Sequence, residues 1–292
     1  MNPGYARPPV RPQSLVVFLS TGRCGTQWLT HCLREHDARV AVEHEPIGPL
    51  YRPRSYFRCY SDPEAILAVP EVRAHVERIA GERHYIETGW PVFAALPLLA
   101  DRFADRLRVV HLTRHPIPTA LSHLAHSSYA GSPRDDAYTR LATLGPSDPN
   151  VFQPEYAARW VELSDYEKCL FWWTEVNQFG LEFPERYGEI PFLRVKSEEL
   201  LGGDRSALED LVEFMGLAWD DAWLARTDRV VDKWHHRTDR DVDPFQIHRH
   251  TTTMETARHL GYDLDDVDLG ALEARYRGEP DAGLDRVGRF AS

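Results

Sequence analysis

An apolar strand pattern that breaks into a glycine-containing loop and resumes as a helix limits this chain to few folds. Residues 15–29 read LVVFLSTGRCGTQWL. Gly22 and Gly25 permit tight turns that present backbone N–H groups, and Thr26 starts a helix whose positive end favours an anion. The stretch therefore predicts a strand, an anion-binding loop and a helix.

The loop differs from the phosphate loop of nucleoside-triphosphate-binding proteins. That loop has four residues between its glycines and then Lys followed by Ser or Thr, which reach the phosphates and magnesium. Here Thr26 follows Gly25 directly, no lysine is present, and the basic residue is Arg23. The spacing argues against a P-loop kinase or NTPase, which stays as the first alternative interpretation.

A second predicted strand ends in a cation. Residues 107–124, LRVVHLTRHPIPTALSHL, predict a buried strand to Thr113, then Arg114, two prolines and a helix from about Pro118. Open α/β sheets bind ligands beyond the carboxyl ends of their strands, so the Arg114 guanidinium is placed to meet a phosphate. Ser122 follows eight residues later. A surface ion pair for Arg114 and a helix cap for Ser122 are the alternative.

Together these stretches resemble the sulfotransferases that use PAPS (3′-phosphoadenosine 5′-phosphosulfate). In that family a basic residue, a small residue, Gly and Thr form the 5′-phosphosulfate loop, while a strand-end arginine and a serine eight residues later hold the 3′-phosphate. FLRVKSEELL at 192–201 and FMGL at 214–217 look like a further, architectural signature of the family, and TMETARHLGY at 253–262 is a weaker echo. The resemblance implies an α/β, three-layer, P-loop NTPase-like fold with a central parallel sheet.

The resemblance also implies a set of nucleotide-contacting residues, taken from the loop, the second motif and a C-terminal segment that would close over the nucleotide. These are Gly22, Arg23, Cys24, Gly25, Thr26, Gln27, Trp28, Arg114, Ser122, Arg249 and Thr251. Arg23 stands where many family members carry Lys; because a guanidinium is no proton donor at neutral pH, its role would be electrostatic. Trp28 has two interpretations, a ring stacked on the adenine or a core residue.

Candidates for a general base follow the second predicted strand, in VEHEP at 42–46. They are Glu43, His44 and Glu45. Carbohydrate and protein-tyrosine sulfotransferases place a glutamate just after that strand, often followed by Pro in the carbohydrate group, so Glu45 with Pro46 fits best. His44 is second, because cytosolic small-molecule sulfotransferases use a histidine, although theirs comes from a later segment. Alternatively, all three side chains are solvent-facing.

Other polar residues carry weaker expectations. The helix end is expected to depress the pKa of Cys24, although the family places a small residue there for shape. His111, His115 and His123 flank the second motif, as auxiliary donors or as core and surface residues. The spacing of four histidines in 232–251, His235, His236, His248 and His250, matches no familiar zinc pattern, so no metal site is predicted.

Composition limits the classes of partner that this chain can bind. A formal net charge of −11 excludes broad attraction to nucleic acid or to anionic lipid, so an anionic ligand needs a locally basic pocket. No apolar run is long enough to span a membrane, and the opening lacks the apolar core of a signal peptide. The four cysteines form no regular framework. We expect a tail over residues 1–13, a single domain over 14–292 and a cytoplasmic location, with the oligomeric state open.

The pattern of elements alternates strand and helix. Strands are predicted near 15–20, 39–43, 84–88, 107–113 and 191–195. Helices are predicted at 26–34 and 71–80, with a long aromatic helix over 156–183 after a surface loop at 130–154.

The expected reaction is sulfuryl transfer from PAPS to a hydroxyl group by metal-independent in-line displacement, with release of adenosine 3′,5′-bisphosphate (PAP). The acceptor is a small molecule or a saccharide. A non-catalytic module that binds a nucleotide is the second alternative.

Overall fold

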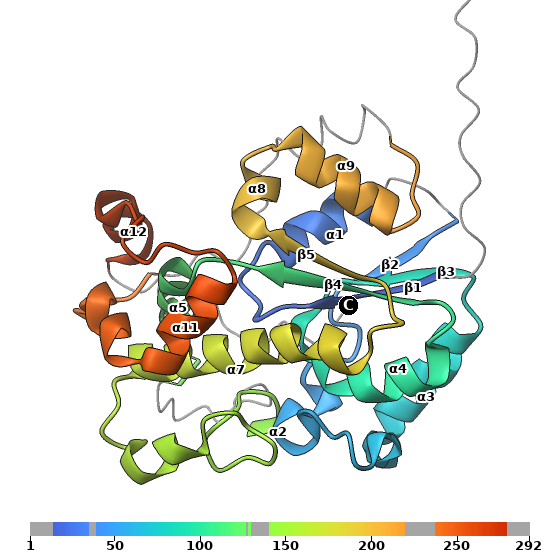
Figure 1. The fold of residues 1–292 in the computed structure, drawn as a ribbon, viewed down its shortest axis with the longest axis horizontal. Helices are drawn as coiled ribbons and strands as arrows, with labels where there is room; N and C mark the ends of the chain where they lie inside the picture. The colour runs from blue at the N-terminus through green and yellow to red at the C-terminus, as the bar shows by residue number, and fades with distance from the viewer. Residues whose placement is uncertain (1–13, 35–38, 127, 130–139, 220–236, 279–292) are drawn as a thin grey trace, which may run out of the picture.

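The computed structural model describes residues 14–34, 39–126, 128–129, 140–219 and 237–278. At its centre lies a five-stranded sheet whose strands are all parallel, in the order β2-β3-β1-β4-β5 (Figure 1). The strands are β1 (Ser14–Leu19), β2 (Ala41–Glu43), β3 (His84–Glu87), β4 (Leu107–Thr113) and β5 (Phe192–Lys196). The predicted tail over residues 1–13 lies outside the described residues.

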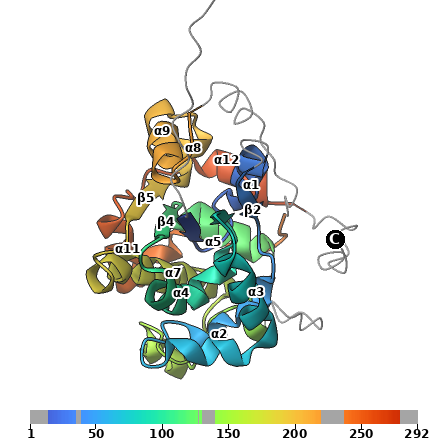
Figure 2. The same ribbon diagram turned by 90° about the vertical axis from the view of Figure 1, so that its right-hand side faces the viewer.

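Helices cover both faces of the sheet (Figures 1 and 2). One face carries α1 (Thr26–Arg34), α8 (Ser197–Leu201) and α9 (Arg205–Phe214). The other carries α3 (Pro70–Ala80), α4 (Leu96–Phe103) and α7 (Asp165–Arg186). Beyond the carboxyl ends of the strands lie α5 (Pro116–Ala125), α11 (Thr251–His259) and α12 (Leu269–Tyr276). The short elements are η1 (Gly48–Tyr51), α2 (Pro53–Tyr56), η2 (Pro63–Ala68), η3 (Trp90–Ala95), η4 (Pro154–Arg159) and η5 (Pro244–Arg249).

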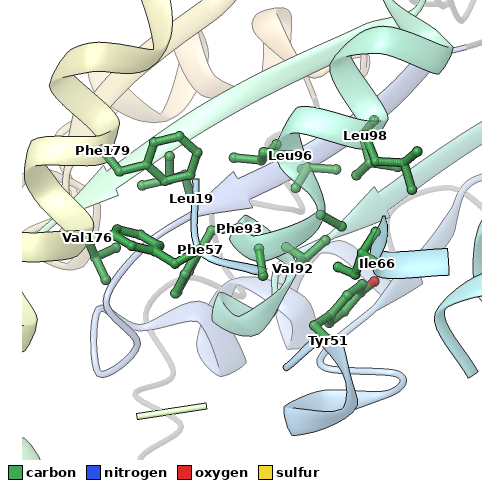
Figure 3. Close-up of a cluster of buried hydrophobic side chains, with 14 of the residues drawn as sticks. Leu19, Tyr51, Phe57, Ile66, Val92, Phe93, Leu96, Leu98, Val176 and Phe179 are labelled. Carbon is green, nitrogen blue, oxygen red and sulfur yellow. The ribbon is translucent and has the colours of Figure 1, made fainter. Parts of the chain in front are cut away.

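Strand β1 is buried along its whole length because both faces of a parallel sheet are covered. Its side chains alternate between two cores. Val16 and Phe18 join the cluster beneath α1 and α9, while Leu15, Val17 and Leu19 join the cluster of α3, α4 and α7. Figure 3 shows part of the cluster beneath α3, α4 and α7. The loop that follows β1 is thus anchored on a rigid strand in the middle of the sheet.

The structure confirms the α/β, three-layer class and all five predicted strands to within two residues. The helices predicted at 26–34 and 71–80 are also present. The predicted helix over 156–183 is wrong at its start, because the chain forms η4 and α7 begins only at Asp165. There Ser164 accepts a hydrogen bond from the Glu167 N–H and the Glu167 side chain accepts one from the Ser164 N–H, a capping box.

The predicted loop over 130–154 is described only in part. Its residues 142–153 form neither helix nor strand, and 130–139 lie outside the described residues. None of the described helices combines the length and apolarity that crossing a membrane requires.

Candidate functional site

The loop between β1 and α1 has the backbone geometry of an anion cradle. Gly22, Arg23 and Gly25 adopt left-handed conformations, with φ of 75°, 60° and 82°. A Cβ on Gly22 would also lie 2.8 Å from Trp90 Cδ1, so this position needs glycine for two reasons. The first turn of α1 contains no acidic residue. The positive helix end is therefore not neutralised by its own first turn and favours an anion.

The two predicted motifs meet at this loop. Arg23 donates from Nε to Ser122 Oγ at 2.9 Å, and Arg114 donates from Nη1 to the Arg23 carbonyl at 2.7 Å. Ser122 is buried, whereas both arginines are partly buried. Arg114 follows the last residue of β4 and Ser122 lies on α5. Two cations thus adjoin one loop in a chain whose net charge is −11, so the loop has the locally basic surroundings that an anionic ligand needs.

The C-terminal contact to Arg114 comes from a residue that the sequence did not indicate. Arg114 donates from Nη2 to Tyr276 Oη at 3.2 Å, and Tyr276 ends α12. Burial raises the pKa of Tyr276, but the charges and hydrogen bonds of Arg114 and Arg275 together outweigh burial and hold that pKa below its ordinary value. Arg249 and Thr251 are exposed residues where η5 meets α11. No hydrogen bond between either of them and Arg114 or Ser122 occurs in the part of the chain that the structure describes.

The three base candidates occupy different environments. Glu43 forms an ion pair with Arg78, and Tyr85 donates to its carboxylate at 2.5 Å. Burial lowers the pKa of His44 despite the opposing charge of Glu45, so His44 is neutral at pH 7. Glu45 is partly buried, with Oε1 at 3.6 Å from His44 Nε2. Glu43 is paired with Arg78 and Tyr85, whereas Glu45 packs against the turn at Gly89 that leads to the anion loop, and this position makes Glu45 the better candidate to accept a proton.

Glu45 packs against the turn that follows β3. A Cβ on Gly89 would lie 2.5 Å from Glu45 N and 2.7 Å from Glu45 Cγ, so only glycine leaves room for Glu45 in this position. The Glu45 backbone is left-handed, with φ of 50°. Trp90, the residue after Gly89, is the one that touches Gly22 of the loop. Gly89 and Trp90 therefore connect the candidate base to the anion loop.

A line of hydrogen bonds also joins the two regions. His44 Nδ1 lies 3.2 Å from Thr88 Oγ1, which lies 2.5 Å from Thr30 Oγ1. Thr30 in turn donates to the Thr26 carbonyl at 2.8 Å, in the first turn of α1. Sequence reasoning missed Thr30, Thr88 and Gly89, and the only local signal is the glycine directly after a predicted strand.

Two expectations about the loop residues need revision. The expected depression of the Cys24 pKa is wrong, because complete burial raises that pKa to about 11. Cys24 therefore stays a neutral thiol. Trp28 is 3% exposed and lies in the core cluster with Leu29 and Leu33, so the structure favours its interpretation as a core residue. Thr26 is buried and Gln27 partly buried at the start of α1.

The histidines of the second motif have structural partners or are buried as neutral rings. Burial lowers the pKa of His111 to about 3, and its Nε2 lies 3.0 Å from Asn177 Oδ1. His115 accepts from the Ile117 N–H and caps α5. Burial likewise lowers the pKa of His123 to about 3, with Arg23 contributing through its charge. All three rings are therefore neutral near pH 7.

The described residues hold no group of three or more His, Cys, Asp or Glu side chains placed to bind a metal ion. Of the four histidines in 232–251, His235 and His236 lie outside the described residues. His250 stacks against Tyr156, whose hydroxyl lies 2.7 Å from its Nδ1, and Glu167 lies 3.2 Å from its Nε2. This ring thus joins the start of α11 to η4 and α7.

Comparison with known proteins gives a fold. No family model and no curated protein matches the chain. A crystal structure of a sulfotransferase from Alicyclobacillus acidocaldarius matches with a TM-score of 0.51 and 16% identity, over 89% of this chain and 99% of that one. The sulfotransferase domain from the curacin biosynthetic pathway gives 0.49 and 13%, over 86% and 98%. That of the Synechococcus PCC 7002 olefin synthase gives 0.48 and 18%, over 89% and 99%. The match to the Alicyclobacillus enzyme confirms the predicted fold: this chain has the fold of the sulfotransferases.

Proposed function

We propose that this protein transfers a sulfuryl group from PAPS to a hydroxyl group of an acceptor. The observation that carries the proposal is the meeting of Arg23, Arg114 and Ser122 at the anion loop. Two guanidinium groups, a serine hydroxyl and the positive end of α1 fit a ligand with two separate anionic groups, since each can bind a phosphate or sulfate oxygen. The sulfotransferase fold, established independently, agrees with this chemistry.

In this proposal the two arginines bind different anionic groups of the nucleotide. Arg23, the loop N–H groups and the start of α1 would hold the 5′-phosphosulfate, while Arg114 and Ser122 would hold the 3′-phosphate. Arg114 also holds the Arg23 carbonyl, so it stabilises the left-handed loop as well as contributing a charge. PAPS supplies an activated sulfuryl group, whose transfer develops negative charge on the bridging oxygen. The Arg23 guanidinium would stabilise that charge without donating a proton.

Glu45 is the proposed general base. The acceptor oxygen forms a bond to sulfur while the bond between sulfur and the bridging phosphate oxygen breaks, and PAP leaves. The hydroxyl proton passes to the Glu45 carboxylate, which makes the attacking oxygen more nucleophilic. His44, neutral and with its Nε2 at 3.6 Å from Glu45 Oε1, would limit the positions open to that carboxylate. The scheme assigns no step to a metal ion.

Titration calorimetry with PAP in EDTA tests the nucleotide site. We expect metal-free binding that weakens roughly 30-fold or more in Arg114→Ala, since a charge-assisted contact is worth about 2 kcal/mol or more. Arg108→Ala is the matched control, because Arg108 lies near the start of β4, the strand that Arg114 follows, and donates to the Phe214 carbonyl. Binding of ATP with magnesium in place of PAP would favour the P-loop kinase or NTPase alternative and overturn the proposal.

Transfer of radiolabelled sulfate from PAPS to a panel of hydroxyl compounds tests the reaction. We expect Glu45→Gln to lower kcat roughly 10²–10⁴-fold with unchanged PAP affinity. Glu43→Gln serves as the control, since it removes a carboxylate one residue from His44 but one that is already paired with Arg78. PAP binding by the wild type without turnover of any acceptor would support the non-catalytic binding module instead.

A further inference from the structure

Trp90 is the one residue of its segment that reaches the surface. Within His84–Ala100, all of which the structure describes, every residue is buried except Trp90, which is partly exposed. Arg23 of the anion loop and Glu45 are partly exposed as well. A large aromatic ring that stays partly open offers an apolar surface for contact with a ligand. Trp90 is therefore accessible from outside together with the two residues that the proposed reaction uses.

The strand order places Trp90 between the anion loop and the candidate base. In the order β2-β3-β1, the end of β3, which leads to Trp90, lies between the ends of β2 and β1 (Figure 1). The end of β2 leads to Glu45, and the end of β1 leads to the loop at Gly22. A Cβ on Gly22 would lie 2.8 Å from Trp90 Cδ1 and 3.3 Å from Trp90 Nε1, and a Cβ on Gly89 would lie 2.7 Å from Glu45 Cγ. Trp90 therefore contacts the loop directly and is one residue from the contact with Glu45.

Aromatic neighbours hold the Trp90 ring in place beside the loop. Its ring is nearly perpendicular to that of Trp172, at 87° with centroids 5.0 Å apart, and is tilted by 34° against Phe93. Trp172 also donates from Nε1 to the Thr21 carbonyl at 2.9 Å, one residue before Gly22. Trp172, Phe93 and Thr21 are all buried. The indole is thus preorganised, and binding a ligand against it would cost little conformational entropy.

We propose that Trp90 is a specificity-determining residue whose indole binds the acceptor, so that the acceptor is a hydroxyl compound with a flat aromatic ring. This rests on the proposed sulfotransferase function and names its substrate class. In-line transfer with Glu45 as the base needs the acceptor oxygen between the sulfuryl group at the anion loop and the Glu45 carboxylate. The strand order puts Trp90 there. Because a pair of aromatic rings gains more than its buried area alone provides, the indole favours an aromatic ring over an aliphatic ring of the same size.

Two alcohols of similar size test this contact. Phenol and cyclohexanol each carry one hydroxyl on a six-membered ring, but only phenol is flat and aromatic. The protein is saturated with PAP in EDTA, which permits acceptor binding without transfer, and is then titrated by calorimetry with each alcohol and with methyl β-glucoside. We expect the wild type to bind phenol roughly three- to tenfold more tightly than cyclohexanol, the range that an aromatic pair provides. In Trp90→Leu this ratio should fall below about twofold, and Trp90→Phe should keep most of it.

Trp160→Leu is the matched control, and it should keep the ratio. Trp160 is also partly exposed and packs edge to face with an aromatic ring, Phe171, at 5.1 Å, but it directly follows η4. The ratio of the two affinities is the readout, so a general loosening of the loop does not imitate the expected result. Trp90→Met replaces Trp90→Leu if the latter does not fold.

Three results would overturn the contact while leaving PAP binding intact. They are equal binding of phenol and cyclohexanol by the wild type, a ratio that survives in Trp90→Leu, and tighter binding of methyl β-glucoside than of phenol. If PAP does not bind, the alcohols are titrated without it. A phenol preference that still depends on Trp90 would then refute the sulfotransferase function and not the binding of an aromatic ring at Trp90.

Discussion

Gly89→Ala should displace the candidate base without touching the nucleotide site. The new Cβ would lie 2.5 Å from Glu45 N and 2.7 Å from Glu45 Cγ, whereas ordinary contact begins at 3.4 Å. The shortfalls are 0.9 Å (3.4 − 2.5) and 0.7 Å (3.4 − 2.7), so Glu45 must move by nearly 1 Å. A misplacement of about 1 Å costs roughly 10²-fold in rate. We therefore expect kcat to fall about 100-fold, with a stability loss of about 1–3 kcal/mol.

Steady-state release of PAP in the presence of a turned-over acceptor measures this effect, and calorimetry with PAP measures the nucleotide site in parallel. PAP affinity should stay within about threefold of wild type, because the substitution removes no hydrogen bond to the nucleotide site and even the loss of one hydrogen bond would change affinity by only a few-fold more. Gly81→Ala is the control, since a Cβ there meets only the Arg78 carbonyl, at 3.5 Å. A Gly89→Ala enzyme that keeps kcat within about threefold of wild type would refute Glu45 as a base held by this turn.

Three further predictions follow from the same geometry. Thr88→Val removes the contacts to His44 and Thr30. In a PAP-release assay kcat should fall at least about tenfold, and in urea denaturation the free energy of unfolding should fall by about 1–3 kcal/mol. An unchanged kcat would contradict the positioning role of Thr88. Tyr276→Phe removes a hydroxyl that competes for Arg114; PAP should bind up to about fivefold more tightly by calorimetry, whereas a tenfold loss would make Tyr276 a phosphate ligand. Burial lowers the pKa of His123 to about 3 in the folded protein, so below pH 6.5 the unfolded chain binds more protons than the folded one. The stability that this neutral ring provides is present above pH 6.5 and lost as pH falls, so the wild type should lose about 2 kcal/mol of unfolding free energy relative to His123→Gln between pH 8 and pH 5. Urea denaturation at each pH measures this difference, and parallel pH profiles of the two proteins would refute it.

The sequence predicted the elements whose signals are local. Apolar runs marked all five strands, and the prolines after Arg114 marked the end of β4. The rule that parallel strands end at one edge of a sheet then brought Arg114 toward the loop at Arg23, and the structure places them in hydrogen-bond contact. A polar stretch inside an aromatic pattern was harder to interpret. The capping box at Ser164 starts α7 nine residues after the predicted start at Tyr156, because local capping outweighs a continuous apolar pattern.

Contacts between distant segments were not predictable in this way. Tyr276 reaches Arg114 across 162 residues, and Thr88 reaches Thr30 across 58. Neither tyrosine nor threonine differs in pattern from an ordinary core or surface residue. The Cys24 pKa was predicted in the wrong direction for a related reason: the effect of a helix end can be read from the sequence, but complete burial cannot, and burial is the larger effect.

The sheet fixes the spacing between the anion loop and the turn that holds Glu45. β1 and β3 are neighbours, with Val17 opposite Glu87, so the anion loop and the Gly89 turn leave the sheet side by side. The Thr30–Thr88 contact joins those two segments within the buried core. The distance between the loop and Glu45 is thus set by the sheet itself.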